Sequence, residues 1–180
     1  MPGTYDGSAA GTAEARALLA ERARRLAQPV EVAPVDQIEV LVFELAGERY
    51  GIESRWVQAV FVLRHRAPLP GAQPPIDGIT AWRGELLTLL ELRATLGLPV
   101  NALHDLARVI VLGLHRQAAF GIVTDAVHSV VQVSVAALHP LPDGAGGHRR
   151  YIKGVTGDAL LILDPERLLR LIEPASAPGE

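Results

Sequence analysis

An internal repeat constrains the fold of this chain more than any other feature of its sequence. The first repeated motif is an aromatic-Gly-Ile triplet followed at fixed spacing by two valines: residues 50–52 with Val57 and Val60, and residues 120–122 with Val127 and Val130. The second is a five-residue stretch with a central glycine: residues 76–80 and residues 152–156. Both motifs occur in the same order in each half, and an apolar stretch follows the second motif each time. The sequence therefore predicts one structural unit that is used twice.

Each unit is predicted to contain about five short strands, few enough to close into a small barrel. Residues 38–45 are apolar on much of both alternating faces, which is typical of a strand buried on both sides. Arg83-Gly84 separates two further apolar stretches, residues 76–82 and 85–92, and is expected to form a turn. Two short helices are indicated by signals at their ends: Gly97 and Pro99 after the first, Asp164 and Pro165 at the start of the second.

The composition agrees with a folded, strand-rich protein. Hydrophobic residues make up 49% of the 180 residues and charged residues 21%, and the apolar content is mostly aliphatic, which favours strands. The formal net charge of −3 gives no general affinity for nucleic-acid backbones. The chain has no cysteine, which excludes disulfides, thiolate nucleophiles and cysteine-bound zinc. No export signal is visible, and the apolar runs are far shorter than the about 20 residues that span a bilayer. We therefore expect a cytoplasmic protein.

The two ends of the chain are expected to lie outside the repeated units. Residues 1–36 combine a flexible start rich in Gly, Ser and Ala with an amphipathic helix at about residues 12–28. This helix has two interpretations: it docks on the body of the protein or extends into solvent, or it binds a partner. Residues 173–180 are predicted to form a C-terminal tail.

No group of residues points to an enzyme, a metal site or a bound cofactor. The six histidines are scattered, without the spacing that gathers a metal ion, and no serine lies in a G-x-S-x-G motif. A nucleic-acid-binding barrel is a weaker alternative, because exposed aromatic residues for base stacking are not interleaved with basic ones. His148, Arg149 and Arg150 are interpreted as the end of a solvated loop, with an anion site as the alternative.

Residues 37–172 resemble the CheW family of chemotaxis coupling proteins. The resemblance rests on short motifs in a fixed order: residues 48–52, Val57 and Val60, residues 78–80, Arg83-Gly84, residues 89–93, residues 109–112, residues 121–123, Asp125, residues 151–155 and residues 160–164. Each motif alone is a weak signal, but their common order is specific. The resemblance implies a mainly β fold of two five-stranded SH3-like barrels over residues 37–172, with their interleaved boundary near residues 97–108. Short helices and the N-terminal helix complete this expected fold.

The resemblance also implies an adaptor without enzymatic activity or cofactor. Such proteins bind the cytoplasmic tip of methyl-accepting chemoreceptors in a groove between the barrels, and they bind the regulatory domain of the histidine kinase CheA. Recruitment to receptors at the membrane is implied as well, without insertion into the membrane, and self-association within arrays stays an open alternative. Nucleic acid is not an expected partner.

Receptor-binding roles are carried over from the family to Arg83, Ser54, Val57, Ala59 and Val60. Arg83 matches the arginine of the family's N-L-R-G turn, and a lone arginine on a turn is seldom needed for packing. Val57 and Val60 have an equally strong alternative as core residues, because repeated apolar positions usually serve packing.

The sequence departs from the family's pattern at several of these places. Ala81 and Trp82 replace the Asn and Leu that precede the turn arginine, and Ala59 replaces a glutamate. Thr88 and Glu91 replace a proline and an aspartate in the strand that follows. These changes leave the expected fold intact but bear on the identity of the partners. The alternative function is a CheW-like binding module in a specialised, non-flagellar pathway with a different partner set.

Overall fold

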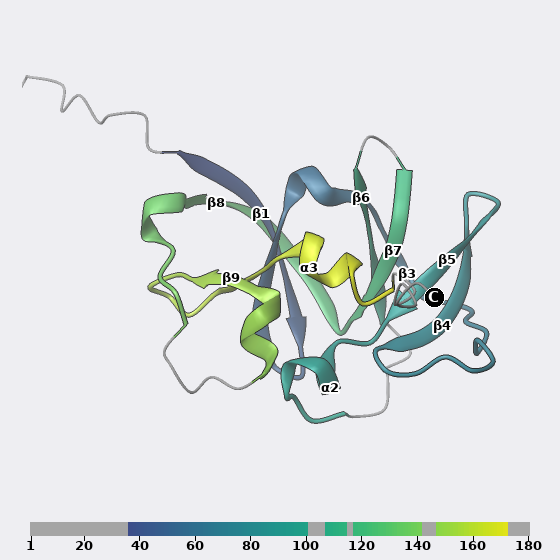
Figure 1. Ribbon diagram of the computed structural model, residues 1–180. Helices are drawn as coiled ribbons and strands as arrows, with labels where there is room; N and C mark the ends of the chain where they lie inside the picture. Colours follow the sequence, from purple (N-terminus) through teal and green to yellow (C-terminus); the bar gives the residue numbers. More distant parts are fainter. Residues whose placement is uncertain (1–35, 101–106, 115–116, 142–146, 173–180) are drawn as a thin grey trace, which may run out of the picture. The chain divides into compact units, whose positions relative to one another are not determined.

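The computed structural model describes residues 36–100, 107–114, 117–141 and 147–172 (Figure 1). The helix expected at residues 12–28 and the tail at residues 173–180 lie outside the described residues. In chain order the elements are β1 (Gln37–Leu45), β2 (Glu48–Glu53), η1 (Ser54–Trp56), β3 (Val57–Val62), β4 (Ile76–Trp82), β5 (Glu85–Leu90), α2 (Arg93–Leu96), β6 (Arg108–Leu114), β7 (Gln117–Thr124), β8 (Ala126–Ser134), η2 (Val135–Ala137), η3 (Gly147–Tyr151), β9 (Ile152–Val155), β10 (Leu161–Leu163) and α3 (Pro165–Leu169). No helix in this part of the chain is long and apolar enough to cross a membrane.

The strands form two five-stranded sheets, which confirms the prediction of a mainly β fold. Sheet A has the strand order β8-β1-β2-β10-β9, and sheet B has the order β3-β6-β7-β5-β4. The two orders are equivalent. Each strand in one sheet occupies the same position as its repeated counterpart in the other sheet, for example β2 in sheet A and β7 in sheet B. In both sheets the central strand, β2 or β7, pairs antiparallel on one side and parallel on the other.

Each sheet takes strands from both halves of the sequence. Sheet A combines β1 and β2 with β8, β9 and β10, whereas sheet B combines β3, β4 and β5 with β6 and β7. The chain changes sheet at residues 54–56 and again at Asp125. The strands on either side of residues 97–108, β5 and β6, belong to the same sheet. A sequence repeat shows which strands are equivalent. It does not show whether a strand pairs with strands of its own half of the sequence or of the other half.

The repeated glycines of β2 and β7 lie where a side chain would not fit. A Cβ added at Gly51 would lie 2.4 Å from Cγ1 of Val40, and one added at Gly121 would lie 2.6 Å from Cγ1 of Val109. Both distances are far shorter than carbon–carbon contacts in packed interiors. The glycine of the repeated triplet thus leaves room for core side chains of the neighbouring strands in each sheet.

Both sheets bend back on themselves at equivalent places. In sheet B, Ala67 and Ile79 exchange two backbone hydrogen bonds of 2.9 Å each. In sheet A, His139 and Val155 exchange two backbone hydrogen bonds of the same length. These bridges tie the segment after β3 to β4 and the segment after β8 to β9, so that each sheet curls into an SH3-like barrel.

The buried side chains form three cores. One lies inside sheet A and includes Val40, Val42, Val133, Leu160 and Ile162. A second lies inside sheet B and includes Leu87, Leu89, Ala107, Val109, Val111 and Val123. The third and largest is shared by both sheets and includes Leu41, Phe43, Trp56, Ile110 and Phe120. Because β1 alternates between an interior core and the shared core, it is buried on both faces, as its sequence predicted.

The turns and helix ends follow the predicted signals. Ala46-Gly47 and Arg83-Gly84 each form a two-residue hairpin turn with positive φ at both positions, the arrangement of a type I′ turn. Gly97 ends α2 in the left-handed conformation. Asp164 caps α3 by accepting hydrogen bonds from the backbone N–H groups of Glu166 and Arg167, with Pro165 in the first turn.

Candidate functional site

Arg83 lies at the tip of the hairpin formed by β4 and β5. The last pair of the hairpin is Trp82 opposite Glu85, so Arg83 and Gly84 alone make the turn. The Arg83 side chain is exposed, and its guanidinium carbon lies 4.6 Å from the centre of the Trp82 ring. This cation–π contact holds the charged group on an apolar base while its donors face outward.

The hairpin also presents apolar side chains next to Arg83. Leu86 is 76% exposed and lies opposite Ala81, which is exposed as well. The neighbouring pair, Thr80 and Leu87, is buried. Sequence reasoning missed the exposure of Leu86, because residues 86–90 are mostly apolar without alternation and therefore do not show which face is outward. The hairpin tip thus combines one fixed cation with a small apolar surface.

The other four positions carried over from the family lie at or near β3, an edge strand of sheet B. Val57 is partly buried against the shared core, and Ala59 is partly buried against the interior core of sheet B. Val60 is 39% exposed. Ser54 opens η1, and its Oγ is enclosed without a hydrogen-bond partner among the described residues.

The structure brings these positions and Arg83 onto one barrel, but not onto adjacent strands. Three strands, β6, β7 and β5, separate β3 from β4 in the order of sheet B. Ala59 and Trp82 nevertheless pack against the same interior core. Of the five predicted residues, Arg83 and Val60 are accessible to a partner, whereas Val57 and Ala59 contribute largely to packing.

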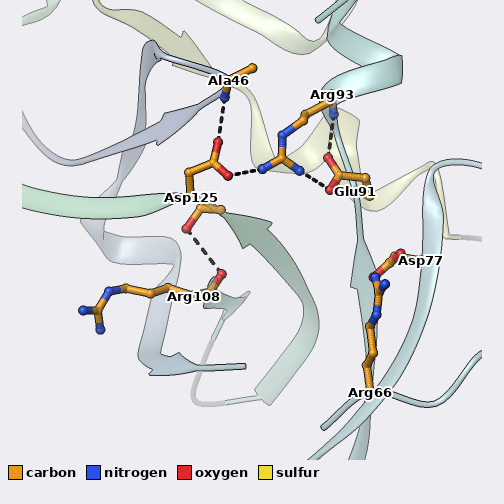
Figure 2. Close-up of polar contacts among 8 residues, drawn as sticks. Ala46, Arg66, Asp77, Glu91, Arg93, Arg108 and Asp125 are labelled. Atoms are coloured by element: carbon orange, nitrogen blue, oxygen red, sulfur yellow. Dashed lines mark hydrogen bonds and ion pairs between the residues drawn. The ribbon is translucent and has the colours of Figure 1, made fainter. Parts of the chain in front are cut away.

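A buried arginine links the elements at which the chain returns from sheet B to sheet A (Figure 2). Arg93, at the start of α2, is 2% exposed and forms ion pairs with Glu91 and Asp125. Asp125 stands between β7 and β8 and accepts a 2.7 Å hydrogen bond from the backbone N–H of Ala46. The backbone N–H of Arg93 donates to Glu91 at 3.0 Å. The cluster therefore fastens α2 to the crossover and to the β1–β2 turn.

Burial has a measurable electrostatic consequence in this cluster. Removal from water raises the pKa of Glu91, and the hydrogen bond from Arg93 and its positive charge only partly oppose this effect. Glu91, Arg93 and Asp125 belong to the motifs of the family resemblance, but the sequence alone assigns them no role. Glu91 and Arg93 are neighbours in the sequence, but Asp125 lies 32 residues beyond Arg93, so the cluster can be identified only when the crossover is known.

A second ionic cluster joins β2 to β9 within sheet A. Glu53 is 5% exposed and lies 2.5 Å from Nζ of Lys153 and 2.7 Å from Nε of Arg55. The described residues contain no group of three or more His, Asp or Glu side chains that could hold a metal ion. The accessible features of this part of the chain include the arginine-tipped hairpin and the edge strand β3.

Two curled five-stranded sheets on one shared core define the class of paired SH3-like-barrel proteins. Within that class the chain belongs to the CheW-like domain family, whose model matches residues 39–173. It is 28% identical over 74 residues to the chemotaxis protein CheW of Bacillus subtilis (strain 168), a match covering 41% of this chain and 47% of that protein. The chain thus spans about half the length of this curated relative.

The fold also agrees with a solved structure. The scaffolding protein TtCheW of Thermoanaerobacter tengcongensis superposes with a TM-score of 0.63 at 24% identity. The superposition covers 71% of this chain and 88% of TtCheW. This likeness confirms the predicted fold of two SH3-like barrels.

Proposed function

We propose that this protein is an adaptor that couples the cytoplasmic tips of chemoreceptors to a CheA-type histidine kinase in a chemosensory array. Membership of the CheW-like family supports this function, as does the similarity to a chemotaxis protein and to a scaffolding protein. The adaptor acts by geometry and forms no bonds with a substrate. It positions the kinase against the receptor so that small receptor movements bias kinase activity.

The observation that carries the receptor-binding part of this proposal is the exposed Arg83 side chain, held on the Trp82 ring at the tip of the β4–β5 hairpin. The φ of Arg83, 52°, lies in the left-handed region, which residues other than Gly, Asn and Asp seldom adopt. A non-glycine residue held there costs on the order of 1–3 kcal/mol. Ala46 and Ala159 adopt the same backbone region, so this conformation does not by itself require an arginine. The exposed guanidinium of Arg83, stacked on the Trp82 ring, is the feature that supports a binding role. Exposure on the hairpin tip points to recognition.

The shared core suits an adaptor that must transmit position. Both barrels contribute side chains to one core, so a partner on sheet B and a partner on sheet A would be held at a constant separation. Each contact can be moderate, because many linked contacts in an array raise the overall avidity. Self-association of copies and recruitment to receptor clusters at the membrane belong to this proposal.

A specialised, non-flagellar pathway is the second candidate, and the hairpin tip favours it. Trp82 supports Arg83 by ring stacking, and exposed Ala81 and Leu86 flank it. Trp82 and Ala81 are departures from the family's turn, so the hairpin tip would suit a receptor with a more apolar surface. The adaptor mechanism is unchanged in this alternative, and only the partner set differs.

The test is co-sedimentation of the full chain with a receptor cytoplasmic fragment and CheA, using Arg83→Asn. Asparagine adopts the left-handed turn conformation more readily than arginine, which stabilises the variant, whereas loss of the cation–π contact with Trp82 destabilises it. The free energy of unfolding should therefore change by less than about 1 kcal/mol. Receptor binding should weaken by about 2–5 kcal/mol if Arg83 pairs with a carboxylate that becomes buried. Kinase binding should be retained.

Arg49→Ala is the matched control, because it removes an exposed arginine from sheet A. It should leave receptor binding unchanged. If Arg83→Asn loses both partners and melts well below the wild type, Arg83 is a structural residue. If the wild-type chain binds neither receptor nor kinase, the coupling function is wrong.

A further inference from the structure

Five basic side chains gather at one end of sheet A, away from the Arg83 hairpin. They come from the η3–β9 segment and from the region of α3: Arg149, Arg150, Lys153, Arg167 and Arg170. All five residues are exposed. The whole chain carries a net charge of −3, so this concentration of positive charge is a local feature. The adaptor function proposed above does not use it.

These residues line two adjoining hollows, which we call together the basic groove. The first has a volume of about 650 Å³ and is lined by Arg150, Tyr151, Arg167, Arg170 and Leu171. The second has a volume of about 490 Å³ and is lined by Pro140, Leu141, Arg149, Arg150, Ile152, Lys153 and Arg167. Arg150 and Arg167 line both hollows, and no Asp or Glu is among the described residues that line them.

Contacts within the groove hold two of the arginines in place. Nη1 of Arg167 donates a 2.9 Å hydrogen bond to the carbonyl oxygen of Arg150, and Nε of Arg167 lies 2.9 Å from Oδ2 of Asp164. The guanidinium carbon of Arg150 lies 4.8 Å from the centre of the buried Tyr151 ring. An arginine that is already oriented loses less conformational freedom when it binds a carboxylate.

Acidic neighbours neutralise only part of this charge. Asp164 pairs with Arg167, and Glu53 pairs with Lys153. Within the described part of the chain, Arg150 and Arg170 form no ion pair with a carboxylate. The groove therefore retains positive charge that a ligand can match.

We propose that the basic groove binds an acidic, partly apolar peptide segment of another protein. Guanidinium groups bind carboxylates through paired hydrogen bonds, which Arg150 and Arg170 can supply. The groove also offers apolar contacts from Leu171, Pro140 and Leu141. This mixture suits alternating acidic and apolar side chains.

A nucleic acid fits the groove less well than such a peptide. Single-stranded nucleic acids are bound by exposed aromatic rings on which bases stack, whereas Tyr151 is 5% exposed and its ring is covered by Arg150. The net negative charge of the chain also opposes an extended phosphate backbone.

The test is fluorescence anisotropy of the full chain with a fluorescein-labelled peptide of alternating Glu and Leu. A second peptide with Gln in place of Glu measures the contribution of charge. The wild type should bind the acidic peptide, and binding should weaken as the salt concentration rises. Arg150→Ala combined with Arg170→Ala should lower the affinity at least about 10-fold. Arg64→Ala, at an exposed arginine beyond β3, should leave it unchanged.

Other outcomes would overturn the proposal. Equal binding of the Glu and Gln peptides, or equal affinity of the double variant and the wild type at equal melting temperature, would show that the groove does not recognise acidic segments. A single-stranded DNA oligonucleotide that binds more tightly than the acidic peptide, with loss in the double variant, would assign the groove to nucleic acid. Because receptor and kinase binding are measured separately, the result does not depend on the coupling function.

Discussion

The buried cluster around Arg93 shows how single residues hold a connection in this fold. Arg93 is enclosed beside two carboxylates, Glu91 and Asp125, and the latter also binds the backbone of Ala46. A buried ion pair of this kind contributes modestly to stability but is costly to break, because removing one partner leaves a charge without compensation. The cluster therefore specifies where α2, the crossover and the β1–β2 turn meet.

Replacement of Glu91 by glutamine should reveal the raised pKa of this carboxyl group. A raised pKa means that the folded state holds the proton more tightly than the unfolded state, so this contribution to stability is present at low pH. It is lost as pH rises from the ordinary value of 4.5 through the higher folded value. Glutamine does not titrate. The unfolding free energy of Glu91→Gln relative to wild type should therefore increase between about pH 4 and pH 7.

Urea denaturation at a series of pH values measures this difference. Any constant effect of the altered contact with Arg93 shifts all points equally and does not affect the trend. Glu85→Gln, at an exposed position of the β4–β5 hairpin, controls for the loss of a carboxylate. A difference that is flat or falls with pH would show that burial does not govern Glu91.

Among the elements, the central strand of each sheet depends on a glycine over which core side chains pack. The central strands β2 and β7 each carry a glycine where the flanking strands leave no room for a side chain. Overpacking of a core typically costs about 1–3 kcal/mol. The glycine is therefore repeated in the sequence because both sheets lack room for a side chain at this position.

We expect Gly51→Ala to destabilise the protein by about 1–3 kcal/mol, because the new Cβ meets Val40. Gly157→Ala is the control, since a Cβ added there meets no atom within 4 Å, and its effect should stay within about 0.5 kcal/mol. Thermal or urea unfolding measures both. Adding Val40→Ala to Gly51→Ala should recover part of the clash energy, as a double-mutant cycle would show. Additive losses would argue against a direct contact.

At the scale of the whole molecule, the two barrels should unfold as one unit. Their shared core is larger than either interior core, and each sheet is completed by strands from the other half of the sequence. Neither half of the chain can therefore complete a sheet alone. A single cooperative transition is expected.

Single-tryptophan variants test this cooperativity. Trp56 lies in the shared core, and Trp82 packs at the margin of the sheet B interior. Unfolding of Trp82→Phe followed by Trp56 fluorescence, and of Trp56→Phe followed by Trp82, should coincide with the circular dichroism of the same variant. A separate transition for Trp82 would show that sheet B unfolds independently.

The strands, the turns and the duplication could be predicted from the sequence, because these features depend on local patterns. The repeated triplets, the apolar run in residues 38–45 and the end signals at Gly97 and Asp164 all correspond to observed elements. The family resemblance indicated Arg83, whose turn geometry the structure now describes. Such signals act over a few residues, and a single sequence displays them directly.

How the repeats combine, and which side chains are accessible, became known from the three-dimensional structure. The exchange of strands between the sheets follows from pairing between segments far apart in the chain, which a local pattern does not encode. For the same reason, the exposure of Leu86, the burial of Arg93 and the meeting of Arg150 with Arg170 in one groove were not visible beforehand. Burial and proximity are properties of the packed chain, because they depend on which distant segments cover a residue.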